Sequence, residues 1–306
     1  MKPLHTRLFA ASLLLGLTLC TQGAMAQSPA AANDAPVEIF ADKTLEWDRS
    51  KKTYTARGNA IARQGTMQVK SDSLTAHYSG GDAGGSAGSS AGLGSSIDKL
   101  TANGGVEISS APYTAHGSDA VYDIATGKAT LTGKNLKIET PTEHLTARDK
   151  IEFDVNKNRL TAMGNATARR GTDSLTSDNL SAFFANGANG KTELQRIIAE
   201  NPVTVKTARE TITGDSGVYD VVAGKATLNG NVRILQGENW LEGTRAEVDL
   251  KTGISKLFAD TPDAAVRPAL IVDGVAKPPA EPLGDGRVRG VFYPKKKEPE
   301  AEASAP

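Results

Sequence analysis

The stretch VYDIATGKATLTGKN, residues 121–135, returns almost unchanged as VYDVVAGKATLNGNV, residues 218–232. Related phrases recur along the chain at a spacing of about 30 residues, which indicates a repeat architecture. Each unit reads as an alternating strand, a Gly/Asn turn, a second alternating strand, a polar bend and a third strand that ends near an aromatic residue or Asp. The sequence therefore predicts stacked β units and not a helical solenoid.

The Gly/Asn phrases mark the expected turns of these units. Examples are ARGNAIA (56–62), AMGNATA (162–168) and LNGNVRI (228–234). Gly and Asn tolerate the positive φ that tight hairpin turns require, so each phrase predicts a hairpin. The aligned positions are Asn59, Gly105, Asn135, Asn165, Pro202 and Asn231.

Apolar residues alternate with Lys, Thr, Ser, Asp and Glu within each unit, as expected for a sheet that is dry on one face and wet on the other. The dry positions that we expect to line an interior groove are Met67, Val69, Leu74, Val106, Ile108, Leu136, Ile138, Ile151, Phe153, Val155, Val203, Val205, Val232, Ile234 and Val248. A one-residue error in register would reverse this assignment.

The dry face must be covered by the sheet itself. Between residues 97 and 259 the one helix candidate, Leu194 to Ala199, reads better as a strand. The sheet is therefore expected to fold into a sandwich, a roll or a β-helix-like stack. Several dry positions hold only Ala, such as Ala56 and Ala102. Such small residues either let the two faces approach closely or leave a groove between them.

The first 26 residues predict a cleaved secretory signal. Lys2 and Arg7 precede a short apolar run, and Ala24-Met25-Ala26 matches the A-x-A pattern of a signal-peptide cleavage site. Cys20 loosely fits a lipoprotein signal, but Leu19 is a poor match at the position before it. Cleavage after Ala26 would remove the only Cys.

The remaining chain divides by composition. Residues 27–36 read as a linker, 37–259 as the β region, 79–96 as a flexible Gly/Ser loop, and 260–306 as a Pro-rich, largely disordered tail. Within the tail, RVRGVFY (287–293) has two interpretations: an added edge strand or docking peptide, and a sticky patch on a linker.

Composition and motifs argue against several classes of function. Lys and Arg together number 35, as do Asp and Glu. The chain therefore lacks the excess of positive charge that nucleic-acid-binding proteins carry. His77, His116 and His144 are each isolated in sequence and predict no metal site and no cofactor. The many aspartates follow the repeat, whereas catalytic residues should break it, so an enzyme is not the favoured interpretation.

One set of motifs resembles a known family. The order P-V-E-I-x-A-D (36–42), G-N (58–59), Q-G-T-M (64–67), D-x-L (72–74) and Tyr78 is similar to the N-terminal signature of the OstA-like family, to which the periplasmic lipopolysaccharide transport protein LptA belongs. Looser repeats extend the resemblance over 37–259.

The resemblance implies a fold and a function. The fold would be all-β: a twisted, open β-jelly roll of two antiparallel sheets built from repeats of about 30 residues. The function would be a periplasmic carrier that binds the lipid A part of lipopolysaccharide. The implied partners are lipopolysaccharide, an LptC-like inner-membrane component, an LptD-like outer-membrane component and further copies stacked end to end.

Strand edges suit such stacking. The first strand (37–41) and the last (254–259) would leave unpaired backbone groups, with Val37, Ile39, Ala41, Ile254, Leu257 and Ala259 as candidate assembly residues. The alternatives are a structural or adhesive β-repeat protein and a secreted polysaccharide-active enzyme.

Overall fold

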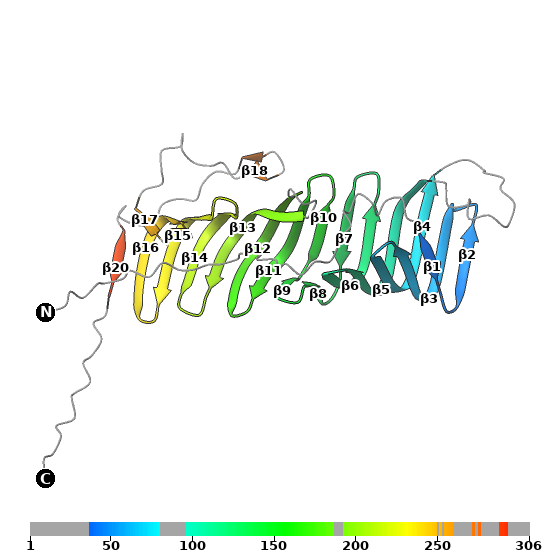
Figure 1. The fold of residues 1–306 in the computed structure, drawn as a ribbon, viewed down its shortest axis with the longest axis horizontal. Coiled ribbons are helices and arrows are strands. Elements are labelled where there is room, and N and C mark those ends of the chain that lie inside the picture. The colour runs from blue at the N-terminus through cyan, green and yellow to red at the C-terminus, as the bar shows by residue number, and fades with distance from the viewer. Residues whose placement is uncertain are drawn as a thin grey trace, which may run out of the picture.

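A computed structural model describes residues 37–79, 96–186, 192–249, 251–252, 254–259, 271–272, 275–276 and 288–292. The expected signal, the N-terminal linker, most of the Gly/Ser loop and most of the tail lie outside these residues. All regular elements of the described residues are β-strands that pair antiparallel, and those of the main sheet follow one another along a single long axis (Figure 1).

The strands are β1 (Glu38–Phe40), β2 (Thr44–Asp48), β3 (Thr53–Gln64), β4 (Met67–Ser79), β5 (Ser96–Ser110), β6 (Tyr113–Asp123), β7 (Lys128–Thr132), β8 (Leu136–Glu139), β9 (Glu143–Ala147), β10 (Lys150–Asp154), β11 (Arg159–Arg170), β12 (Asp173–Asn186), β13 (Thr192–Lys206), β14 (Thr211–Asp220), β15 (Lys225–Gln236), β16 (Asn239–Asp249), β17 (Ile254–Phe258), β18 (Ile271–Val272), β19 (Val275–Ala276) and β20 (Arg289–Val291). β18 and β19 pair only with each other.

The main sheet is bent into two arms that share their long strands. We call arm A the continuous ladder that begins with β2, runs through β7 and β10, and ends with β17. Arm B begins with β1, runs through β8 and β9, and ends with β20. Each of the long strands, β3–β6 and β11–β16, has one part of its length in arm A and the other part in arm B. The chain thus crosses from one arm to the other on every pass.

Each long strand changes register where it passes between the arms, along a line that we call the apex. In β3 the shift lies between Arg57 and Ala60, and in β15 between Asn229 and Val232. Such β-bulges bend a strand and increase its twist. Two passes, out and back, make up the repeat of about 30 residues.

The Gly/Asn phrases lie at the apex, which corrects the prediction that they form hairpin turns. Gly58 and Asn59 have φ of 82° and 43°, and Gly164 and Asn165 have 83° and 48°. The positive φ is present as expected. In β3 and β11 it bends a continuous strand instead of ending it, because both sides of the bulge pair with the same neighbouring strand, whereas Asn135 lies between β7 and β8.

The hairpin turns lie at the outer edges of the arms. At the edge of arm A, aspartates that end a strand accept hydrogen bonds from backbone N–H groups within the turn. Lys51, Thr126, Lys157, Ala223 and Thr252 donate to Asp48, Asp123, Asp154, Asp220 and Asp249, respectively, over 2.8–3.0 Å. This side-chain cap explains why the VYD phrase recurs with its Asp.

The fold prediction is confirmed: the protein is an antiparallel, all-β, open jelly roll. The expected two sheets are the two arms of one hydrogen-bonded sheet. The candidate helix Leu194–Ala199 lies within β13, as the strand interpretation predicted. Of the two interpretations of residues 287–293, the edge strand applies to Arg289–Val291, which pairs with Trp240–Glu242 of β16.

Candidate functional site

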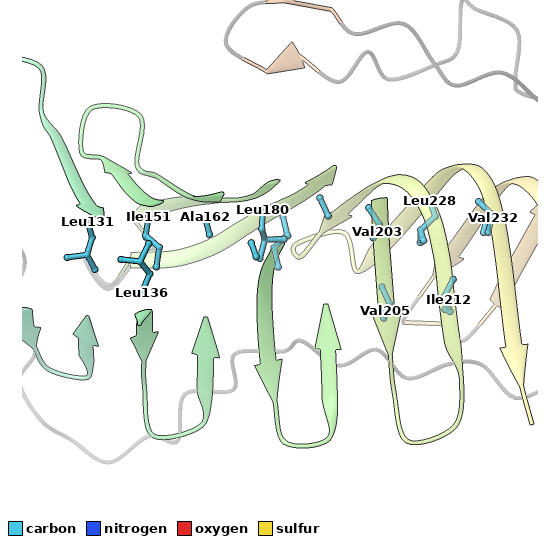
Figure 2. Packing of buried hydrophobic residues seen from close by; sticks show 14 of the residues in the cluster. Leu131, Leu136, Ile151, Ala162, Leu180, Val203, Val205, Ile212, Leu228 and Val232 are labelled. Atoms are coloured by element: carbon cyan, nitrogen blue, oxygen red, sulfur yellow. The ribbon is translucent and has the colours of Figure 1, made fainter. Parts of the chain in front are cut away.

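The inner faces of the two arms carry apolar side chains that pack together, and we call this apolar interior between the arms the trough. One cluster of buried residues runs through it, from Ala102 to Ala246, and takes members from both arms. Figure 2 shows Leu131, Ile151 and Leu180 of arm A together with Leu136 and Val203 of arm B. The arms approach closely near the apex: a Cβ added to Gly117 of arm B would lie 2.7 Å from Cγ of Leu131 of arm A.

The bottom of the trough, beside the apex, is filled by small side chains. Ala60, Ala162 and Ala166 have no exposed surface, and Val106 and Val232 have at most 1%. These alanines therefore let the arms approach closely, one of the two roles that the sequence left open. Larger side chains here would force the arms apart.

The upper walls of the trough are less covered than its bottom. On β15 the inward-facing Val232 is fully buried, while Ile234, two residues farther from the apex, is only partly buried. On β5, Val106 and Ile108 show the same difference. On these two strands burial falls from the apex toward the outer edge, whereas on β13 Val203 and Val205 are both buried.

The structure places the predicted lining residues at different depths. Val106, Leu136, Ile151, Val203, Val205, Val232 and Val248 are buried. Val69, Leu74, Ile108, Ile138 and Ile234 are partly buried against the cluster, and Phe153 is partly buried on β10. Met67 and Val155 are exposed by 45% and 43%, because Met67 opens β4 beside a turn and Val155 follows the last residue of β10.

The outer faces of the arms are charged. Lys70 Nζ lies 3.0 Å from Glu107 Oε1, and Lys150 Nζ lies 3.3 Å from Glu152 Oε2.

A shallow cleft of about 440 Å³ lies on the outside of the apex and is lined by polar groups that include Arg148 and Asp149. This cleft is separate from the apolar trough. The residues that the structure describes contain no His, Cys, Asp and Glu grouping suited to a metal ion.

Two histidines that are isolated in sequence lie near one carboxylate on the outer face of arm B. His116 Nε2 lies 3.8 Å and His144 Nδ1 lies 3.4 Å from the carboxylate of Glu139. A hydrogen bond from Lys137 holds the pKa of Glu139 below its ordinary value. Sequence spacing could not show this cluster, because the pairing of β8 with β6 and β9 creates it.

Unpaired strand edges lie at both ends of the trough. Within the described residues, β1 and β2 pair only with β3, and β17 and β20 pair only with β16. Of the candidate assembly residues, Val37, Ile39, Ala41, Leu257 and Ala259 are partly buried. Ile254 is 55% exposed. The C-terminal edge also includes β20, which the sequence prediction did not place there.

A bent antiparallel sheet with an apolar interior and charged outer faces defines the class of protein: an all-β jelly roll built from repeats. In the described part of the chain, no helix is long and apolar enough to cross a membrane. Comparison with known proteins defines the family within this class.

The sequence model described as "LptA/(LptD N-terminal domain) LPS transport protein" matches residues 38–149 and 144–254. The protein therefore belongs to the family of LptA and the N-terminal domain of LptD, the lipopolysaccharide transport proteins. The two successive matches agree with the repeated construction of the sheet.

Two individual proteins are also similar. An uncharacterized protein of Rhizobium meliloti is 27% identical over 116 residues, which cover 36% of this chain and 62% of that protein. The crystal structure of LptH, the LptA-homologous periplasmic component of the lipopolysaccharide transport device from Pseudomonas aeruginosa, aligns with 50% of this chain and 95% of its own. Its sequence identity is 16% and its TM-score 0.38.

Proposed function

We propose that this protein is a non-enzymatic periplasmic carrier that holds the lipid A part of lipopolysaccharide in the trough and passes it from the inner toward the outer membrane. The family supports the transport role. The observation that carries the ligand assignment is the decrease in burial from Val232 to Ile234, which leaves apolar walls above a filled bottom.

The trough suits acyl chains for a physical reason. Burial of apolar surface contributes about 25 cal/mol per Å² and has no preferred direction, so acyl chains can slide along a uniform wall. The repeat supplies such a wall from pass to pass, while the charged outer faces stay in water. On this proposal the predicted inward residues contact lipid according to their depth, with partly buried positions such as Ile108, Ile138 and Ile234 contributing most.

The proposed location and partners follow from the same role. Residues 1–26 direct the chain to the periplasm and are removed there. An LptC-like component delivers the lipid, an LptD-like component receives it, and copies of this chain stack end to end between them. The unpaired edges at both ends of the sheet support this arrangement.

A charge placed on the trough wall tests the lipid assignment. Ile234→Glu puts a carboxylate on the partly buried inner wall, whereas Leu235→Glu puts one on the adjacent residue, which is 40% exposed. We expect Ile234→Glu to weaken lipopolysaccharide binding about tenfold or more, because a buried unpaired charge is costly. Leu235→Glu should bind as the unmodified protein does.

The chemical part of the ligand is identified by competition. Purified lipid A should displace bound lipopolysaccharide, and the delipidated polysaccharide should not. Displacement by the polysaccharide alone, or equal loss of binding in both Glu variants, would contradict the proposal and favour a sugar-binding surface.

A further inference from the structure

Two hairpins extend arm A beyond the row of turns at its outer edge. In most passes this row holds an aspartate that caps the turn directly after it. On β4 and β12 the same row holds His77 and Phe183, which carry no carboxylate to cap a turn. Both strands continue instead: β4 stays paired with β5 as far as Ser79, and β12 with β13 as far as Asn186.

Each extension begins with a β-bulge. The register shifts directly before Tyr78 in β4 and directly before Phe184 in β12. The shift leaves one residue of the opposite strand outside the pairing register, Asp98 in β5 and Gln195 in β13. Such a bulge bends the strands at the point where they pass the row of turns. The two extensions therefore share one construction.

The turn before each extension holds its first strand. The N–H of Tyr78 donates a hydrogen bond to the carbonyl oxygen of Lys52 at 3.1 Å, and the N–H of Phe184 donates to that of Asn158 at 2.9 Å. Both acceptor residues adopt a positive φ, 53° at Lys52 and 45° at Asn158. The same contact with the same backbone conformation thus occurs twice.

The turn after each extension holds its second strand. The N–H of Ile124 donates to the carbonyl oxygen of Asp98 at 2.8 Å, and the N–H of Val221 donates to that of Gln195 at 2.9 Å. The bulged residues therefore have backbone partners outside their own hairpin. Each extension is bonded to arm A on both sides.

The side chains added beyond the bulges face the trough. On β4, Tyr78 follows the buried Ala76 at the spacing of two residues that keeps side chains on one face. Ile97 pairs with Tyr78. On β12, Phe184 pairs with Leu194, which packs against the core cluster. We call Tyr78 and Ile97 the first station, and Phe184 and Leu194 the second station.

Both stations carry apolar surface that the protein covers only in part. Each of the four side chains is partly buried. At the first station the Tyr78 ring lies 5.2 Å from the Tyr54 ring, and its hydroxyl accepts a hydrogen bond from Trp47 Nε1 at 2.9 Å. The second station is a Phe and a Leu. Each station stands one inward row farther from the apex than the neighbouring strands reach.

We propose that the two stations are separate ligand-binding sites, each of which holds the acyl chains of one lipid molecule against the raised wall of arm A. The assignment rests on the proposed carrier function and goes beyond it, because it divides the trough into two sites. Burial of apolar surface scales with area, so lipid binds more tightly where the wall is higher. Between the stations the lower wall lets lipid move on.

The distance between the stations suits two separate molecules. In arm A the strands β6, β7, β10 and β11 lie between the two hairpins. The hairpin centres are six strand spacings apart, which is about 29 Å. A group of acyl chains can therefore occupy each station without reaching the other.

Photo-crosslinking at adjacent phenylalanines tests the second station. A photoreactive residue at Phe184 faces the trough, whereas one at Phe183 lies on the outer side, where Phe183 pairs with Arg196. With the full chain and purified lipopolysaccharide, we expect a lipid adduct at 184 and none at 183. The adduct at 184 should also be about threefold stronger than one at Phe153, which lies on β10 between the stations.

Binding stoichiometry tests whether the stations are independent. The full chain should bind two lipopolysaccharide molecules, and Phe184→Ala combined with Leu194→Ala should bind one. A photoreactive residue at Tyr78 should give the same adduct in both backgrounds. Phe183→Ala is the matched control and should bind two. Circular dichroism checks folding, and Phe184→Ala alone repeats the measurement with the cluster residue Leu194 in place.

Two results would overturn the two stations: adducts of equal strength at 183 and 184, and a full chain that binds a single lipid molecule. The adduct at Phe153 separates this outcome from failure of the carrier proposal. If lipid crosslinks at 153 but not at 184, the carrier function stands and the stations fail. If it crosslinks at neither position, both proposals fail.

Discussion

Individual residues at the apex explain the most repeated feature of the sequence. Asn59 and Asn231 adopt φ of 43° and 49°. Their side-chain amides donate to Asp42 Oδ2 and Asp215 Oδ2 at 2.7 and 2.8 Å. Asn therefore satisfies two demands of the bulge at once: a positive φ and a hydrogen bond to the preceding pass of the chain. Asp42 and Asp215, two of the acids that follow the repeat, accept these bonds.

Replacement of Asn231 separates those two demands. Asn231→Ala should lower the free energy of unfolding by about 1–2 kcal/mol, because Ala resists positive φ and the bond to Asp215 is lost. Asn231→Gly loses the same bond but accepts the backbone conformation, so its cost should be smaller. Urea unfolding measures both, and equal effects would argue against a conformational contribution.

The turn aspartates predict how stability depends on pH. A backbone hydrogen bond from Thr126 lowers the pKa of Asp123, and one from Thr252 lowers the pKa of Asp249, relative to the ordinary 3.8. A carboxylate whose pKa is lowered on folding stabilises the fold above its ordinary pKa. That contribution is lost as pH falls through the folded-state value. Stability should therefore decline below about pH 4.

Asp123→Ala checks this origin of the acid sensitivity. The variant should have a lower Tm than the parent at pH 7, and the difference should shrink as pH falls toward 2 and Asp123 of the parent takes up a proton. Thermal unfolding followed by circular dichroism at both values gives the comparison. A difference in Tm that is the same at pH 2 and pH 7 would show that charge is not the cause.

Alternation predicted side-chain direction well within strands and less well at their ends. Val69, Ile108, Ile138 and Ile234 pack against the core cluster as the period of two implies. Val155 has the same spacing as Ile151 and Phe153 but does not share their inward direction. The reason is that β10 ends at Asp154 and the turn changes the direction of the chain. A pattern of period two carries no information about where a strand stops.

At the scale of the strand, the position of each Gly/Asn pair was predictable from the sequence, but its effect on the chain was not. A positive φ at Gly58 and Asn59 is compatible with a hairpin and with a bulge. The outcome depends on strand pairing. Arg57 and Ala60, which flank Gly58 and Asn59, both pair with residues of β4. That information lies in residues outside the local phrase, so local turn chemistry could not supply it.

The close approach of the arms at the apex predicts a sharp response to size. Ala162 on β11 has no exposed surface and pairs with Ile151 and Leu180, which are also buried. Ala162→Leu should destabilise the protein by about 1–3 kcal/mol through overpacking. Ala168→Leu, on the same strand in a partly buried position, should cost less. Urea unfolding compares them, and equal costs would contradict a tightly closed apex.

At the scale of the whole molecule, repetition builds a continuous wall. Each pass adds one strand to both arms, so the apolar trough lengthens without any single residue being decisive. The sequence predicted this dry face and its extent over residues 37–259. It offered an added edge strand as one interpretation of residues 287–293 but could not predict its partner, because the contact joins Arg289–Val291 to Trp240–Glu242 across a long stretch of chain and uses only three residues.

The measurement that tests the central claim most directly is photo-crosslinking to lipopolysaccharide at two adjacent residues of β10. Phe153 shares the inward face with the buried Ile151, and Glu152 faces outward, 3.6 Å from Lys128. With a photoreactive residue at each position in turn, we predict a lipid adduct at position 153 and none at 152. Equal adducts at both positions, or none at either in a folded protein, would contradict a lipid-binding trough between the arms.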